Sequence, residues 1–526
     1  MCIRDSSYDA TWTESQTAQA AQDLGTPGRL EPNRRTGDSI EPIVLPPVLE
    51  SQPGVAEAGA VLRGSALLPA SDRSAEFLAV DAARPDLIVG ELRRRDRVLV
   101  AVDALVRRRP DVDAIANPGS PAALELQLNA PGEPEPDVVE EDVTDGEATA
   151  DEAVDEPPPP PPEPFAGTVS LVVRDADGLV HRLDGGAIGP GGNDLVFELS
   201  ARLDDGSLVP ARAPLDVVGL DIGSPARRVA GEDLEVALGP LVAVDVDGSR
   251  TSVPWVASDL LASTEVFGFL GTQAGMTIDE ARTDGGRIVT IAPGATAFGI
   301  VPVVHTLEPR TIAGEQADAV PVVVSASWLT ESGTAVGDVV PMSLGRSDDV
   351  RVEVVDVVDA VPSIDPTMVD AVLVDLPTLL WSEREPGRSP REPSEYWFAE
   401  DGEVDSVALA LPPVEATSVE LVRERIDRLL SDPAAVASIG ALLLGFLAAA
   451  SFALVGFLVT VAVSASERRV EFGLLSALGL TAGQRRRWLS LERLILVVTA
   501  VGLGTFLGWL LARLILPVVS LSNDGT

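Results

Sequence analysis

A long stretch without any charged side chain limits what this chain can fold into more than any other feature does. The stretch runs from Pro433 to Ser466 and contains GALLLGFLAAASFALVGFLVTVAV. A helix needs about 20 apolar residues to cross a bilayer, so this stretch is long enough. Ser431 and Asp432, directly before Pro433, are typical of a helix start. We therefore predict a transmembrane helix over residues 433–466.

A second apolar run lies close to the end of the chain. Residues 494–512, LILVVTAVGLGTFLGWLLA, carry no charge, and Arg513 after them can reach back to the membrane interface. We predict a second transmembrane helix over residues 493–517. Residues 518–526 would then form a short external segment.

The segment between the two apolar runs is short and basic. Residues 467–493 hold six arginines and three glutamates, whereas the whole chain has 39 basic and 81 acidic residues and a formal net charge of −42. Short basic loops stay on the cytoplasmic side of a membrane. We therefore expect a multi-pass protein of the plasma membrane, with residues 467–492 in the cytoplasm and residues 1–432 outside the cell.

The composition excludes several classes of function. The negative charge argues against a nucleic-acid partner, because phosphates would repel it. Every basic residue is arginine, so neither a P-loop lysine nor a Schiff-base lysine is present. Cys2 is the single cysteine, which leaves no disulfide framework and no thiolate metal site. Hydrolase motifs such as G-x-S-x-G and H-E-x-x-H are also missing. We expect no enzyme activity and no cofactor.

The acidic part before the membrane segment divides by composition. A linker is expected where a run of acidic residues precedes six prolines, because such a segment cannot pack into a core. Repeated strand-turn-strand patterns after it predict a β-sandwich or jelly-roll-like domain. The predicted fold is a multidomain α+β membrane protein, whose extracellular α+β domain is interrupted by this β domain. The expected parts are 1–37 (a stub beginning MCIRDS and a disordered N-terminus), 38–130 (α+β domain, first part), 131–164 (linker), 165–315 (β domain), 316–416 (α+β domain, second part) and 417–432 (juxtamembrane helix).

Three turns that end in Asp-Gly mark hairpins of the β domain. They are D-A-D-G at 175–178, D-D-G at 204–206 and V-D-G at 246–248. His181 and His305 lie in or beside strands of this domain, far apart and without a neighbouring metal-binding pattern. We interpret both histidines as structural and expect no metal site.

Three further segments carry specific predictions. AVPVVVSASWL at 319–329 indicates a buried strand followed by a short helix, and VDSVALAL at 404–411 indicates a strand. Residues 417–432 are typical of an amphipathic helix, since Thr417 and Glu420 have the spacing of a capping box. Its apolar face would hold Val419, Val422, Ile426, Leu429 and Leu430.

The basic loop has more internal order than a simple charged tether. Apolar residues from Val470 to Leu478 fall on one face of a short helix that would stop at Gly479. Thr481 and Gln484 fit a capping box that starts the next helix. Such a helix–break–helix segment is typical of an anchor at the lipid interface or of a docking element.

The sequence ERRVEFGLLSALGLTAGQRRRWLSLE resembles the cytoplasmic loop of the FtsX-like permeases of ABC transporters, with the MacB-type architecture. In that family an E-R-R-x-E-x-x-x-L-x-A-L-G segment follows a transmembrane helix, and a Glu opens the next one. PGVAEAGAVLRG (53–64), GTAVGDVVPMSLG (333–345) and AVLVDLPTLL (371–380) are similar to segments of the family's extracellular domain. The matching loop residues are Glu467, Arg468, Arg469, Glu471, Leu475, Ala477, Leu478, Gly479 and Glu492.

The resemblance implies a permease subunit that performs no chemistry of its own. A separate cytoplasmic P-loop ATPase would bind the 467–492 loop, with residues 470–479 as the coupling helix. Movement would pass through the bilayer-spanning helices and the 417–431 helix to the extracellular domain, in a dimer of permeases. Relatives move lipids, lipoproteins or peptides outward, or activate cell-wall hydrolases, and the sequence does not choose between these. The family has further transmembrane helices on both sides, so we expect a fragment truncated at each end.

A second hypothesis stays open at this point. The chain could be a membrane-anchored extracellular binding or sensor protein, whose β-sandwich domain takes a ligand and whose helices only anchor it. Such a protein would need no contact with an ATPase.

Overall fold

The computed structural model describes most of the chain, in two units that are treated separately below. One unit comprises Ala18–Asp365 and Val369–Arg423, and the other comprises Met1–Thr17, Pro366–Met368 and Glu424–Thr526. The stub and the 131–164 linker lie outside the described residues. The described residues are 13–14, 16–33, 40–68, 73–88, 92–112, 114–130, 166–203, 205–225, 233–256, 258–266, 274–281, 285–292, 302–312, 319–346, 349–385, 387–409, 414, 416–431, 433–467 and 481–523.

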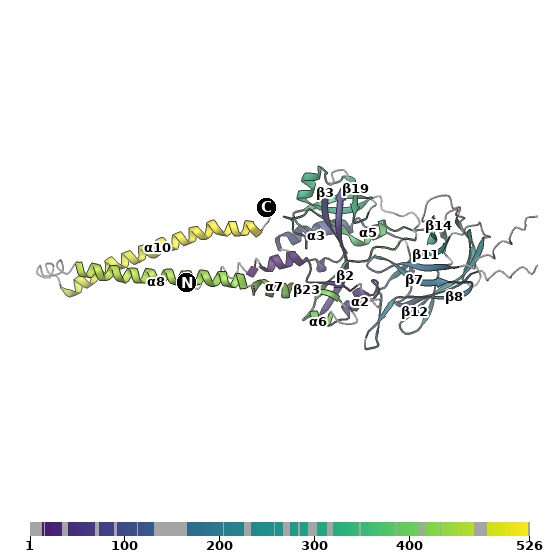
Figure 1. The fold of residues 1–526 in the computed structure, drawn as a ribbon, viewed down its shortest axis with the longest axis horizontal. Coiled ribbons are helices and arrows are strands. Elements are labelled where there is room, and N and C mark those ends of the chain that lie inside the picture. Colours follow the sequence, from purple (N-terminus) through teal and green to yellow (C-terminus); the bar gives the residue numbers. More distant parts are fainter. Residues whose placement is uncertain are drawn as a thin grey trace, which may run out of the picture. The chain divides into compact units, whose positions relative to one another are not determined.

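A nine-stranded mixed sheet organises the first unit (Figure 1), and we call it the body sheet. Its strand order is β19-β20-β18-β21-β3-β2-β22-β1-β23, with β18–β20 and β3–β21 parallel. β19 also pairs with β2, so six of the strands form a closed ring. The strands are β1 (Gly28–Pro32), β2 (Val55–Leu68), β3 (Arg73–Val80), β18 (Val320–Ser325), β19 (Val339–Leu344), β20 (Asp349–Val358), β21 (Ala371–Asp375), β22 (Glu395–Glu400) and β23 (Ala416–Leu421).

Two hydrophobic cores cover the two faces of the body sheet. Strand β18 is apolar throughout because both of its faces are buried. Val322 and Val324 lie in one core, and Val323 lies in the other. The predicted strand and short helix over 319–329 are confirmed as β18 and α4, and Ser325 caps that helix by accepting from the Trp328 amide. The helices around the sheet are α2 (Leu45–Glu50), η1 (Pro85–Leu87), α3 (Leu92–Val106), α4 (Ala326–Ser332), α5 (Leu376–Ser382) and α6 (Ser406–Leu409), and α7 (Val422–Leu430) follows β23 in the chain.

The strands that lie between β3 and β18 in the sequence form a β-sandwich. One sheet has the order β14-β17-β11-β6-β7 with β4 beside β11, and the other has the order β15-β16-β12-β5-β8 with β13 beside β12. Trp255, Phe197 and Leu307 are fully buried between these sheets. The strands are β4 (Ile115–Asn117), β5 (Pro121–Ala130), β6 (Gly167–Arg174), β7 (Val180–Ile188), β8 (Gly191–Glu198), the short pair β9 (Ser200–Arg202) and β10 (Leu208–Pro210), β11 (Leu215–Pro225), β12 (Leu234–Asp245), β13 (Arg250–Val253), β14 (Leu260–Val266), β15 (Gly275–Ala281), β16 (Arg287–Ala292) and β17 (Pro302–Pro309).

Two predicted domain boundaries need correction. Residues 28–32, expected to be disordered, form β1 and pair with both β22 and β23, with Leu30 fully buried. Residues 115–130, assigned to the α+β domain, supply β4 and β5 to the sandwich instead. β5 alternates buried and exposed side chains, as a strand of a two-sheet sandwich does. The sandwich therefore begins before the linker rather than after it.

Two predicted elements near the membrane segment are wrong. VDSVALAL was expected as a strand, but Ser406–Leu409 is a single helical turn whose Leu409 is buried against the body-sheet core. Thr417 and Glu420 do not form a capping box, because both lie in β23, which pairs with β1. Val419 and Leu421 alternate at the period of a strand as well as at that of a helix, and pairing with β1 decides between the two. The amphipathic helix is confined to α7.

Candidate functional site

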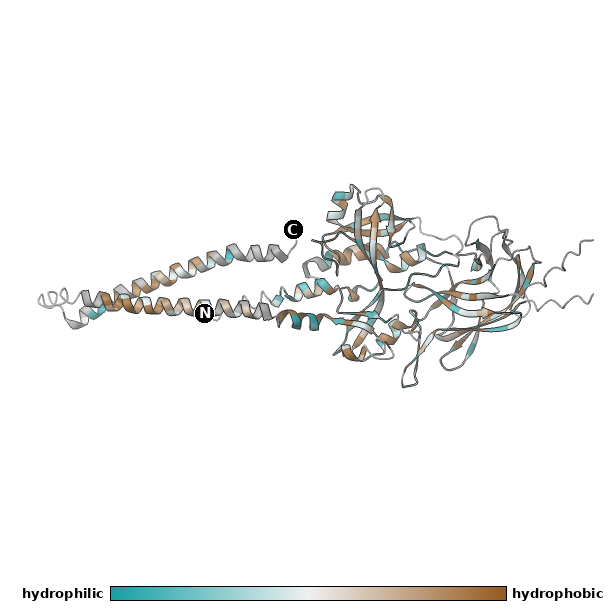
Figure 2. Cartoon of the chain, in the orientation of Figure 1, coloured by the Kyte–Doolittle hydropathy of each residue, from teal (hydrophilic) through white to brown (hydrophobic). Residues whose placement is uncertain are grey.

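Helix α8, Pro433–Glu467, reproduces the predicted 433–466 span almost residue for residue. Among the residues that the structure describes, it is the one helix long and apolar enough to cross a membrane, over Leu444–Val463 with mean hydropathy 2.4. In Figure 2 the ribbon of this stretch has mostly the colours of hydrophobic residues, and none of that window is buried inside the chain. The hydroxyls of Ser451 and Thr460 donate to carbonyls of the preceding turn at 2.8 Å. All this suits a helix surrounded by lipid, where polar groups need partners within the helix.

Helix α10, Ala482–Asn523, contains the second apolar run. Its clearly apolar part, Val497–Leu507, is shorter than a bilayer span, so a second span over 493–517 stays a prediction. Thr499 and Thr505 donate to carbonyls four residues earlier at 2.7 and 2.8 Å, as the hydroxyls of α8 do.

The predicted coupling residues lie between and at the ends of these helices. Glu467 is the last residue of α8, and Glu492 lies within α10. α10 begins at Ala482, directly after Thr481, so the predicted helix start there is confirmed. The other seven lie outside the described residues: Arg468, Arg469, Glu471, Leu475, Ala477, Leu478 and Gly479.

A short chain segment leads from the body sheet toward α8. β23 ends at Leu421 and α7 begins at Val422, whose amide donates to the Pro27 carbonyl at 3.0 Å. Arg423 donates to the Val404 carbonyl and lies 3.8 Å from the Glu400 carboxylate. The first turn of α7 is thereby held by the same unit that contains the sheet, and α8 follows α7 after two residues.

The body sheet itself is fastened by a buried carboxylate at the end of β21. Asp375 has no exposed surface and caps α5, accepting from the Thr378 hydroxyl at 2.5 Å and its amide at 3.2 Å. It also accepts from Arg109 Nε and Nη2 at 2.9 and 2.6 Å and from the Ala82 amide at 3.1 Å. Asp375 belongs to the 371–380 segment quoted in the sequence analysis, and its contacts join that segment to the chain after α3 and to the end of β3.

Charged residues also join the sandwich to the body sheet and its helices. Arg84, after β3, donates to the Asp177 carboxylate, which also accepts from Arg212 of the sandwich. Arg212 in turn donates to Glu50 of α2. Both arginines donate to the same carbonyl, that of Ala58 in β2, at 2.8 Å each. Burial, together with the nearby Asp175 carboxylate, raises the pKa of Asp177.

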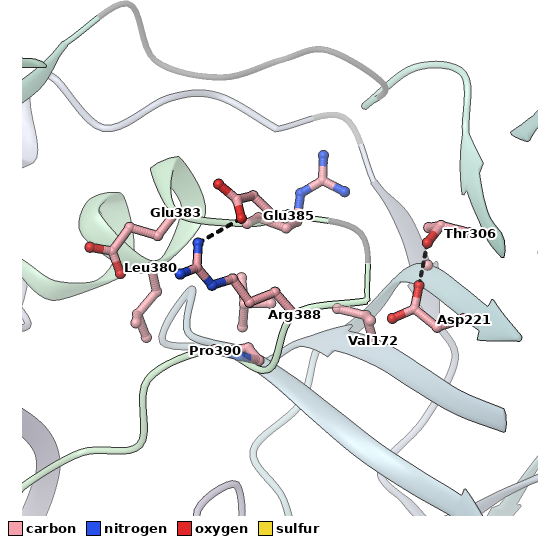
Figure 3. Close-up of a pocket in the computed structure, with 11 residues that line it drawn as sticks. Val172, Asp221, Thr306, Leu380, Glu383, Glu385, Arg388 and Pro390 are labelled. Carbon is pink, nitrogen blue, oxygen red and sulfur yellow. Dashed lines mark hydrogen bonds and ion pairs between the residues drawn. The ribbon is translucent and has the colours of Figure 1, made fainter. Parts of the chain in front are cut away.

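The loop after α5 makes a second contact with the sandwich, drawn in Figure 3. Asp221 is buried, accepts from the Thr306 hydroxyl at 2.5 Å, and its pKa is raised by burial. Arg384 lies 4.7 Å from the Trp381 ring centroid and donates to Glu308 at 2.6 Å. The cavity between loop and sandwich has a volume of about 20 Å³, room for about one water. This junction is packed and does not form a binding site.

A wider hollow of about 550 Å³ lies over the body sheet. Three glutamates line it, and each already pairs with an arginine: Glu31 with Arg29 at 3.5 Å, Glu76 with Arg63 at 2.5 Å, and Glu395 with both arginines. Two arginines thus serve three glutamates, and each carboxylate has a positively charged partner.

The two histidines occupy different environments in the sandwich. His181 Nε2 lies 2.8 Å from the Asp175 carboxylate. His305 is fully buried, its Nδ1 lies 3.0 Å from the Thr264 hydroxyl, and its Nε2 has no hydrogen-bond partner. Burial lowers the pKa of His305 to about 4. Across the described part of the chain, no group of three His, Cys, Asp or Glu side chains is placed to hold a metal ion.

These observations define a class: a β-rich body joined through a short helix to a C-terminal helical membrane segment. Residues 435–526 match the family model of the FtsX-like permease C-terminal domain. This match relates residues 435–526 to the FtsX-like permease family, whose members are components of ABC-type permeases in the plasma membrane. Neither the curated proteins nor the solved structures contain a significant match to the chain.

Sequence reasoning predicted helix α8 and missed the charged joints. Asp375, Arg109, Arg84 and Asp177 are four of the 120 charged residues, and no local pattern distinguishes the first three. Asp177 belongs to the D-A-D-G pattern, which predicts a turn. Two similar turns in the same domain indicated that this one was an ordinary hairpin.

Proposed function

We propose that this chain is the membrane subunit of an ABC-type complex that couples a separate cytoplasmic ATPase to a large extracellular body. The observation that carries the proposal is the family match over residues 435–526, which includes α8, α10 and the basic loop between them. The ATPase would bind the 467–492 loop, and the residues from Glu467 to Gly479, with Glu492, would form the contact.

The order of elements along the chain supports a mechanical role. A strand of the body sheet, β23, leads directly into α7, and α7 leads into α8. Because a helix resists bending and its residues move together, a shift of α8 would reach the edge of the body sheet through the nine residues of α7. The residues outside the membrane would thus respond to events at the cytoplasmic loop.

The composition supports a separate energy source. Hydrolysis of ATP by a P-loop protein requires a lysine on the nucleotide phosphates, and the sequence contains none. The distribution of charge along the sequence favours the orientation in the membrane, since the basic loop would stay in the cytoplasm and the acidic body outside. Two copies of the permease would match a dimeric ATPase.

The decisive experiment compares two loop variants with two surface variants of the same chemistry. Glu471→Arg and Leu475→Asp change the loop, whereas Glu235→Arg on β12 and Val407→Asp on α6 change exposed positions elsewhere. We expect the loop variants to lose a co-purifying P-loop ATPase while remaining in the membrane, and the surface variants to retain it. Unchanged ATPase association and ATP-dependent activity in both loop variants would refute the proposal.

The neighbouring reading frame offers a simpler check. A permease of this kind is expected beside a gene for a P-loop ATPase. If no ATPase associates with the purified protein and the sandwich instead binds a ligand, the chain is an anchored sensor.

A further inference from the structure

Three hairpin turns of the sandwich share a hydrogen bond and a glycine conformation. In each, a glycine amide donates to the carbonyl three residues earlier: Gly178 to Asp175 at 3.0 Å, Gly206 to Leu203 at 2.9 Å, and Gly248 to Asp245 at 2.9 Å. The three glycines have φ values of 82°, 85° and 81°. An aspartate precedes each glycine, so the turns share the Asp-Gly pair, this hydrogen bond and the positive φ of the glycine.

Their surroundings are not equivalent. Asp247, in the turn between β12 and β13, is exposed, and its pKa is lowered by hydrogen bonds from Ser249. Asp205, in the turn between β9 and β10, is likewise exposed. Asp177, in the turn between β6 and β7, has a nearly buried carboxylate between two arginines. Burial at this one turn therefore comes from what it contacts and not from its own fold.

The contacts of the 175–178 turn cross from the sandwich to the rest of the unit. Charges alternate across the boundary, from Arg84 to Asp177 to Arg212 to Glu50. The tip also touches α5, because a Cβ added to Gly178 would lie 3.2 Å from the Cβ of Pro377. The equivalent Cβ on Gly248 would meet no atom within 4 Å.

We propose that the 175–178 turn is a latch that fixes the sandwich to the body sheet, so that the two move together. Paired and partly buried charges hold their geometry more firmly than exposed ones, because removing one partner leaves the others desolvated and unpaired. The shared acceptor at Ala58 draws both arginines onto one strand of the body sheet. The sandwich then acts as a fixed extension of the body and not as a swinging receptor domain.

The matched turns provide the test in the full-length protein. Cys2→Ser removes the single native cysteine, and Ala335→Cys with Ser252→Cys places one spin label on each side of the boundary at exposed positions. The distance distribution between the labels is then measured by electron paramagnetic resonance. We expect a single narrow distribution in this background and in Asp247→Ala, and a broader, shifted one in Asp177→Ala.

Glycine variants separate docking from backbone strain. Gly178→Val and Gly248→Val impose the same positive-φ cost, but only the former places a side chain against Pro377. The distribution should broaden in Gly178→Val and stay narrow in Gly248→Val. Asp177→Asn keeps the shape of the side chain and replaces the alanine variant if the latter does not fold. Equal widths in the Asp177 and Asp247 variants, or in the two glycine variants, would overturn the latch. The distance measurement involves no ATPase, so its result tests the latch independently of the proposed function.

Discussion

Arg109 donates two hydrogen bonds to the Asp375 carboxylate, from Nε at 2.9 Å and from Nη2 at 2.6 Å, and the Asp375 side chain has no exposed surface. Asp375 also caps α5 and accepts from an amide next to β3. One ion pair thus connects the chain after α3, the end of β21 and the start of α5. The other donors to Asp375 are neutral, whereas Arg109 brings a positive charge. The buried negative charge of Asp375 is therefore well compensated only while Arg109 is present.

Arg109→Ala should therefore destabilise the protein severely. We expect a loss of about 3–5 kcal/mol in the free energy of unfolding, because the substitution leaves a buried carboxylate without its cation. Arg97→Ala is the matched control, since Arg97 pairs with Asp356 at 2.7 Å but is 52% exposed. Its loss should stay below about 1 kcal/mol. Urea denaturation followed by tryptophan fluorescence measures both, and equal losses would show that Asp375 does not depend on Arg109.

His305 should make the sandwich sensitive to mild acid. Its pKa is about 4 in the folded protein, against an ordinary value of 6.5, because burial disfavours the charged ring. Between these two values the unfolded chain binds a proton that the folded chain does not, so stability is lost as the pH falls from about 6.5 to about 4. The loss attributable to this one group is on the order of 3 kcal/mol.

The measurement compares wild type with His305→Leu across this pH range. The leucine variant removes the titrating ring, so the stability difference between the two proteins should shift in favour of the variant as the pH falls. Carboxylates titrate in both proteins and cancel in the difference. A difference that stays constant from pH 7 to pH 4 would contradict the role given to His305.

Gly28→Ala should weaken the attachment of β1 to the body sheet. A Cβ at position 28 would lie 2.2 Å from the ring of Phe398, which is fully buried in β22. Overpacking of this kind costs about 1–3 kcal/mol. Gly192→Ala in β8 is the control, because its Cβ would meet nothing within 4 Å. The urea midpoint should fall for Gly28→Ala alone, and an unchanged midpoint would mean that the ring can move aside.

The elements that could be predicted from the sequence are those with a strong local signal. Helix α8 follows from a charge-free run with a proline at its start, and β18 follows from a run of valines. Strand β1 could not be found this way, because GRLEP holds one large apolar residue, Leu30, and owes its conformation to β22 and β23 on either side. Tertiary pairing overrides a weak local preference in such segments.

The charged joints of the candidate site were beyond sequence reasoning for a different reason. With 81 acidic residues in the chain, the pairing of Asp375 with Arg109 is one among very many possible pairs. Their sequence separation is 266 residues, so the contact exists only once the body sheet is complete. The coupling loop differs from these joints, because its proposed role rests on the sequence motif alone.

Arg423 offers a last test, at the point where the body sheet leads into α7. Its guanidinium donates to the Val404 carbonyl and lies near Glu400, so it ties the first turn of α7 to the segment after β22. Arg423→Ala removes both interactions, and we expect local opening to become easier by about 1 kcal/mol. Amide hydrogen exchange over residues 416–424 should then be about fivefold faster. Arg428→Ala removes an exposed arginine of the same helix and should leave those rates unchanged. Equal exchange in the two variants would mean that pairing of β23 with β1 alone holds the start of α7, and that a pull on α8 would reach the body sheet through the backbone of β23.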